Sequence, residues 1–102
     1  MIIYYKDIPQ VLLDNERAYF KILQASIEAV DELSTMEIRR NPSSYQFRIA
    51  ISSRNYLNPL VSSLNDLHNL LGISLTYSKS IKSSYALSFK IPLTSQKLLQ
   101  NN

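Results

Sequence analysis

The sequence has no cysteine, and among its 102 residues it has only one histidine and one glycine. Without cysteine there is no disulfide, no thiolate metal ligand and no cysteine nucleophile. Loops that cradle phosphate in nucleotide-dependent enzymes need several closely spaced glycines, whereas this chain has only Gly72. With His68 as the single histidine, the sequence contains no combination of residues spaced for Ser-His-Asp catalysis or for a zinc centre. We therefore expect a protein that is not an enzyme, with no catalytic residue, no metal site and no cofactor.

Long apolar segments are also missing. No run approaches the roughly 18 consecutive apolar residues that a membrane-spanning helix requires. The opening segment, residues 1–6, lacks the basic region and the long apolar stretch of a signal peptide. These absences predict an intracellular, soluble protein that does not bind membranes.

The second half of the sequence repeats the first half. Residues 17–41 align with 54–78 and, after three skipped residues, 42–51 align with 82–91. Nine of the 35 aligned positions are identical: Arg17/Arg54, Tyr19/Tyr56, Leu23/Leu60, Ser26/Ser63, Leu33/Leu70, Ser43/Ser83, Ser44/Ser84, Tyr45/Tyr85 and Ile51/Ile91. A repeat this short cannot bury a core alone, so the two copies are expected to share one. The sequence thus predicts a single domain, residues 1–102, made of two internal repeats at about 17–51 and 54–91.

Each repeat is predicted to begin with a helix. Apolar and small residues recur at steps of three and four, which is the spacing of a buried helical stripe. The stripes are Tyr19, Leu23, Ser26, Val30 and Leu33, widened by Phe20 and Ile27, and Tyr56, Leu60, Ser63, Leu67 and Leu70, widened by Leu57 and Leu64. The first helix starts either after Asp14 or at residues 7–9. Asn58-Pro59 marks the start of the second helix, and Gly72 marks its end.

After each helix the apolar period changes to two. This alternation predicts two hairpins, with strands at residues 36–40 and 45–51 and at residues 73–77 and 85–91. The resulting fold class is α+β: an antiparallel sheet carries both helices on one face, and a pseudo-two-fold axis relates two αββ repeats. A candidate extra N-terminal strand at residues 1–5 would give an element order that contains a ferredoxin-like βαββαβ. Residues 94–100 form either a short helix or a frayed tail.

Charge is distributed unevenly along the chain. Residues 1–37 carry seven acids and three bases, whereas residues 38–102 carry one acid and eight bases. Five cations are predicted on the polar face of the sheet and in the loop beside it: Arg39, Arg48, Lys79, Lys82 and Lys90. Such a patch can neutralise phosphates without reading bases. Aromatic residues for base stacking are not expected on this face, because the strand tyrosines and phenylalanines belong to the core register. Sequence-nonspecific nucleic-acid binding is therefore one predicted function.

The sequence favours a different function, recognition of a protein or peptide partner, which includes a second copy of the chain. Duplicated αββ units leave a groove between them, and sheet edges accept an extended segment by strand addition. Recurring residues near the helix starts are the candidate protein-binding residues: Arg17, Tyr19, Arg54 and Tyr56. The alternative is that the tyrosines end the core stripes and the arginines are solvated. A further group on one helix, Glu28, Asp31 and Glu32, is interpreted as a solvated acidic surface rather than a metal site.

Two resemblances to known proteins add to these predictions of fold and function. In residues 60–91, Leu71-Gly72-Ile73 joins a helix to strand, turn and strand, and this third of the chain resembles half of a LAGLIDADG homing endonuclease, a family built from αββ repeats. The glycine-and-acid motif of that family has no counterpart at either helix end, so metal-dependent DNA cleavage is not expected. Over its full length the chain resembles small proteins of archaeal filamentous viruses such as those of Acidianus, on its length, its lack of cysteine and stretches such as residues 43–50 (SSYQFRIA). That resemblance implies a location in the host cell or the virion and no assigned activity.

Overall fold

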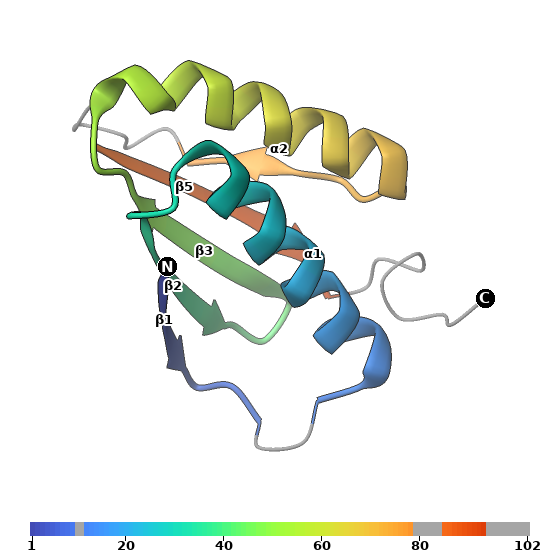
Figure 1. Ribbon diagram of the computed structural model, residues 1–102. Coiled ribbons are helices and arrows are strands. Elements are labelled where there is room, and N and C mark those ends of the chain that lie inside the picture. The colour runs from blue at the N-terminus through green and yellow to red at the C-terminus, as the bar shows by residue number, and fades with distance from the viewer. Residues whose placement is uncertain (10–11, 79–84, 94–102) are drawn as a thin grey trace.

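The computed structural model describes residues 1–9, 12–78 and 85–93 and has the α+β architecture that the sequence predicts. Within these residues, two helices cover one face of a five-stranded sheet (Figure 1). Along the chain the elements are β1 (Ile2–Lys6), α1 (Asp14–Val30), β2 (Thr35–Arg40), β3 (Ser44–Ala50), a 3₁₀ turn (Arg54–Tyr56), α2 (Leu57–Leu71), β4 (Thr76–Tyr77) and β5 (Ala86–Pro92).

The sheet is mixed, with the strand order β1-β2-β3-β5-β4. β1 runs parallel to β2, and the other neighbouring strands are antiparallel. The expectation of a purely antiparallel sheet is therefore wrong at one pair, because α1 carries the chain back along the sheet before β2 begins. The element order along the chain contains the ferredoxin-like succession βαββαβ, followed by β5. The strand order in the sheet differs from the ferredoxin-like one, in which another strand separates the two parallel strands of each βαβ unit, because β1 and β2 are direct neighbours.

Local signals define the ends of both helices. At the start of α1 the Glu16 carboxylate accepts a hydrogen bond from the Leu13 N–H at 3.1 Å, and so satisfies one of the amide groups that a helix start leaves unpaired. α2 begins at Leu57, one residue before the predicted Asn58-Pro59 signal. It ends at Leu71, and the φ of 67° and ψ of 29° at the following Gly72 confirm the predicted left-handed stop.

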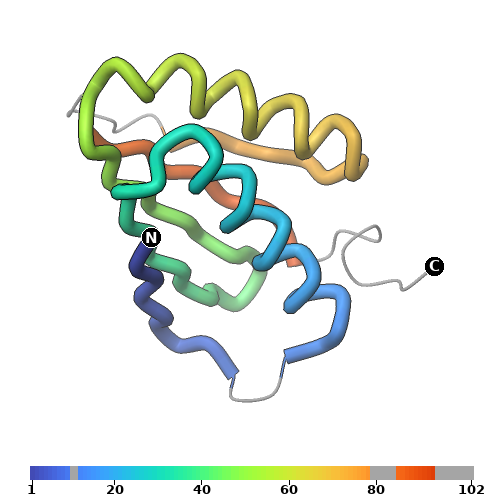
Figure 2. Tube along the Cα trace, in the orientation of Figure 1, coloured from blue at the N-terminus to red at the C-terminus, as the bar shows by residue number. Residues whose placement is uncertain are grey.

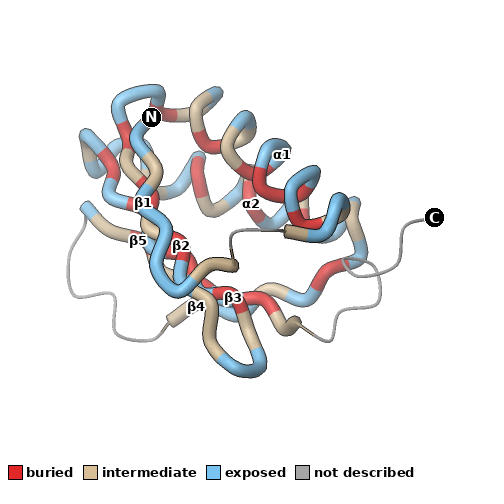
Figure 3. Tube along the Cα trace, turned by 90° about the horizontal axis from the view of Figure 1, so that it is seen from below, coloured by how far each residue is buried: buried red, intermediate tan, exposed pale blue. Residues whose placement is uncertain are grey.

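The core lies between the helices and the sheet. Buried and exposed residues alternate along β3, with Tyr45, Phe47 and Ile49 inward and Gln46 and Arg48 outward. Buried segments occur along both helices and along the strands (Figure 3). The inward residues of β2, β3 and β5 join the buried faces of α1 and α2 in one cluster that draws on both halves of the sequence. The predicted alternation of these three strands is thus confirmed.

The helical stripes differ from the prediction at their C-terminal ends. Leu33 is 75% exposed because α1 ends three residues earlier, at Val30. Leu70 lies within α2 but is 84% exposed, because the buried face of this helix follows steps of four residues. The buried residues of α2 are Leu60, Leu64 and His68. His68 therefore has the core position that the sequence pattern assigned to Leu70.

The second hairpin also differs from its prediction. Of the predicted strand at 73–77, only Thr76 and Tyr77 pair with β5. Tyr85, expected in the core, is 53% exposed because it precedes β5 at the end of the sheet. Several predicted features lie outside the described residues: Lys79, Lys82 and the helix or tail at 94–100.

The two helices run in roughly opposite directions over the sheet (Figures 1 and 2). The Tyr19 hydroxyl, in the first half of α1, is 2.7 Å from Nε2 of His68, near the end of α2. Neither helix in the described part of the chain combines the length and the apolar composition needed to cross a membrane.

Candidate functional site: the open face of the sheet

One face of the sheet carries no helix, and the strand register determines which side chains lie on it. Directly paired residues on neighbouring strands point to the same face, as do residues two apart along one strand. On this side one line of paired residues crosses all five strands of the described sheet: Lys6, Arg39, Gln46, Lys90 and Thr76. Because neighbouring strands lie about 4.8 Å apart, the backbone positions of its three cations span about 14 Å.

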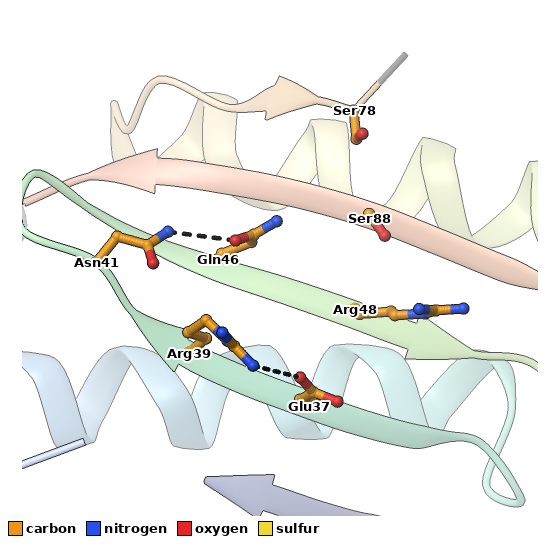
Figure 4. A pocket seen from close by; sticks show the side chains of 7 residues that line it. All are labelled: Glu37, Arg39, Asn41, Gln46, Arg48, Ser78 and Ser88. Carbon is orange, nitrogen blue, oxygen red and sulfur yellow. Dashed lines mark hydrogen bonds and ion pairs between the residues drawn. The ribbon is translucent and has the colours of Figure 1, made fainter. Parts of the chain in front are cut away.

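A second line runs beside the first, two residues away along each strand. Its members are Tyr4, Glu37, Arg48, Ser88 and Ser78, the last joined through its N–H, which donates to the Ser88 carbonyl oxygen at 2.9 Å. We call the surface made by these two lines the open face. Residues of both lines, with Asn41, surround a hollow of ≈ 370 Å³ (Figure 4). In Figure 4 the labelled side chains stand on the near side of the strands, and the helices lie behind the sheet.

The open face is cationic. It has four basic residues, Lys6, Arg39, Arg48 and Lys90, and one acid, Glu37, so its net charge is +3 (4 − 1). Glu37 Oε1 lies 3.7 Å from Lys6 Nζ and 3.8 Å from an Arg39 guanidinium nitrogen. Within the described residues, Arg48 and Lys90 form no ion pair. Exposed ion pairs are weak, so the cations stay accessible to an anionic ligand.

The structure places Arg39, Arg48 and Lys90 together on this face, where the strand alternation predicted them. Their role in binding stays a prediction. Sequence reasoning missed Lys6 and Tyr4, because it assigned no neighbour to the candidate N-terminal strand. Residues 2–6 (IIYYK) do not alternate between apolar and polar, so the sequence held no local signal for the face on which these two side chains lie. Tyr4, paired with Glu37 and 55% exposed, corrects the expectation that this face lacks an aromatic residue.

The predicted protein-binding residues do not form one surface. Arg17 is exposed and pairs with Asp14 at 2.9 Å, while Tyr19 is buried, with 3% of its surface exposed. Arg54 and Tyr56 lie in the 3₁₀ turn before α2, at the opposite end of the helix layer (Figure 1). Tyr19 is thus a core residue at the end of its stripe, and Arg17 is solvated, as the alternative interpretation of these two residues proposed.

His68 is buried between the helices and the sheet, and both of its ring nitrogens are hydrogen-bonded. Its Nδ1 lies 2.6 Å from the Leu64 carbonyl oxygen, which can only accept, so Nδ1 carries the proton and donates. Nε2 then accepts a hydrogen bond from the Tyr19 hydroxyl at 2.7 Å. Burial lowers the pKa of His68, partly opposed by the Leu64 carbonyl, and burial raises the pKa of Tyr19. Both groups are therefore neutral near pH 7, and their hydrogen bond joins the two helices.

Two buried carboxylates are also used within the fold. Glu16, which caps α1, accepts a second hydrogen bond from the Tyr45 hydroxyl on β3. Burial, reinforced by the Glu16 contact, raises the pKa of Tyr45. Asp31, just after α1, accepts hydrogen bonds from the Ser52 N–H and hydroxyl, each at 2.7 Å, and from the Leu33 N–H at 3.2 Å. Asp31 thereby fixes the end of α1 to the segment after β3.

The predicted acidic helix surface is divided by this arrangement. Asp31 is buried, whereas Glu28 accepts a hydrogen bond from the Gln24 amide at 2.8 Å and Glu32 is exposed. Across residues 1–9, 12–78 and 85–93, no group of three His, Cys, Asp or Glu side chains is placed to hold a metal ion.

No protein-family model matches the sequence, and no curated protein matches it. The open face is thus the best-defined candidate site.

Proposed function

We propose that the protein binds nucleic acid through the open face without reading the base sequence. The observation that carries this proposal is the line of Lys6, Arg39 and Lys90 across the sheet, with Arg48 in the adjacent line. A nucleic-acid backbone is a regular series of phosphates, and cations on neighbouring strands can neutralise several of them together. Gln46 and Ser88 add hydrogen-bonding groups of the kind that contact phosphate and sugar oxygens.

The binding test is fluorescence anisotropy with a labelled DNA single strand and with its duplex. If the four cations of the open face each contact a phosphate, affinity should fall about 50- to 150-fold between about 50 mM and about 200 mM salt, the single strand giving the smaller change. Absence of binding to either probe at the lower salt concentration would refute the proposal. Binding that does not respond to salt would also refute it, because phosphate contacts necessarily release counterions.

Self-association through the edge of the sheet is a second candidate function, supported by β1. This strand ends the sheet and pairs on one side only, with β2, among the described residues. Ile2, Tyr4 and Tyr5 are more than half exposed there. A second copy is the occupant that fits: two β1 strands paired antiparallel about Tyr4 would place each Lys6 opposite an Ile2. No like charges then oppose each other across the junction, and like charges directly opposite are destabilising.

Two substitutions at one position test this register. Ile2→Lys would place lysine opposite Lys6 of the second copy and should shift the protein toward monomer, whereas Ile2→Glu would place a carboxylate there and should preserve or strengthen the dimer. Sedimentation velocity over a range of protein concentrations measures both effects. A wild-type protein that is monomeric at every concentration, or equal association of the two variants, would contradict the proposed junction.

A further inference from the structure

Tyr4 distinguishes the kinds of nucleic acid that the open face can hold. It is the aromatic residue in the two lines of this face. It lies beside the line that holds Lys6, Arg39 and Lys90, here called the cation line, and it precedes Lys6 by two residues on β1. Residues two apart along a strand are separated by about 6–7 Å. A phosphate held by Lys6 or Arg39 therefore lies within one nucleotide's reach of the Tyr4 ring.

The ring is accessible because of its place in the sheet. β1 is the edge strand, and Tyr4 has 55% of its surface exposed. Its paired neighbour, Glu37, is held near the Lys6 and Arg39 cations at 3.7 and 3.8 Å, which reduces the repulsion between this carboxylate and an incoming phosphate. Tyr4 thus combines an open aromatic surface with cations beside it, the two components of single-strand binding sites.

We infer that the preferred ligand is a single strand of nucleic acid, with its backbone along the cation line and one base stacked on Tyr4. The inference rests on the proposed function. Bases in a duplex are stacked on their neighbours inside the helix and cannot reach a side chain on a flat sheet, whereas an unpaired base can turn toward it. The geometry therefore assigns Tyr4 a contribution to single-strand binding that it does not make to duplex binding.

Tyr5 supplies the matched control. It is the next residue on the same strand and is 56% exposed, but it pairs with Ile38 on the opposite, helix-bearing face. With the labelled single strand, Tyr4→Ala should weaken binding about five-fold or more, the loss expected for one stacked base, while Tyr4→Phe keeps the ring and should bind as wild type does. Tyr5→Ala should leave single-strand affinity unchanged, and none of the three changes should alter duplex affinity.

The outcomes separate this inference from the proposal on which it rests. Tighter binding of the single strand than of the duplex at equal salt, lost in Tyr4→Ala alone, would establish it. Salt-dependent binding of both probes with no effect of Tyr4→Ala would overturn the stacking role and leave the cationic face as the binding site. Equal losses in Tyr4→Ala and Tyr5→Ala would assign the effect to the stability of β1 and overturn the inference too. Absence of binding to either probe would overturn both.

Discussion

At the scale of single residues, two buried hydrogen-bonded pairs join elements of the fold. The Tyr19 hydroxyl bonds to His68 between the two helices, and Glu16 bonds to Tyr45 between α1 and β3. A buried polar group without a partner costs free energy, so each such pair favours one arrangement of helix and sheet over its alternatives. The lone histidine, an obvious residue to consider for catalysis, is used in this way. Its two hydrogen bonds, to the Leu64 carbonyl and to Tyr19, contribute to stability.

His68 makes stability depend on pH. In the unfolded chain a histidine titrates near about pH 6.5, whereas burial lowers the pKa of His68 in the folded protein. Between these two values the unfolded chain binds more protons than the folded protein, so the free energy of unfolding should fall as the pH drops below about 6.5. Urea denaturation at about pH 7.5 and at about pH 5.5 should show this loss in the wild type, and His68→Asn should show a smaller one.

An NMR titration checks the cause directly. The chain has one histidine, so its ring signals need no assignment among several candidates. A midpoint below about 6.5 is expected. A midpoint at or above that value would mean that the ring is solvated or paired with an anion, and the hydrogen bond to Tyr19 would then not describe the folded state.

At the scale of elements, the sequence predicts what depends on local pattern. The two-residue period of β2, β3 and β5 identified their inward faces, and Gly72 identified the end of α2, because side-chain alternation and left-handed backbone geometry are properties of a few adjacent residues. The end of α1 was missed. Asp31, which accepts bonds from Ser52 across a long stretch of sequence, ends the helix region before Leu33, and no local signal reveals such a contact.

Strand pairing depends on distant residues, and this is where prediction failed. The short apolar N-terminal segment gave no indication that it would lie parallel to β2, so the place of Lys6 beside Arg39 was not foreseen. Two of the three cations in this line, Arg39 and Lys90, therefore followed from alternation, whereas Lys6 required the topology. The two-fold axis that would relate the two repeats stays a prediction. The two hairpins differ in length, because β2 and β3 pair at six positions whereas β4 and β5 pair at two.

At the scale of the whole molecule, the division of charge along the sequence is only partly kept on the surface. Seven acids lie in residues 1–37, but Glu16 and Asp31 are buried and Glu37 lies among the cations of the open face. The helix layer is accordingly less acidic than the sequence suggests, and it carries exposed cations of its own. Net charge alone would attract nucleic acid to any side of such a molecule, so the proposed site requires a test of where the charge lies.

Two triple variants with equal net charge provide that test. Arg39→Ala, Arg48→Ala and Lys90→Ala remove three cations from the open face, while Arg17→Ala, Lys21→Ala and Arg54→Ala remove three exposed cations from the helix layer and the turn before α2. Either set changes the formal net charge from +3 to zero. Only the first set should flatten the plot of log affinity against log salt, by about two to three in slope, because only those cations release counterions at the interface. Equal slopes for the two variants would show that binding follows net charge, and the open face would then not be the binding site.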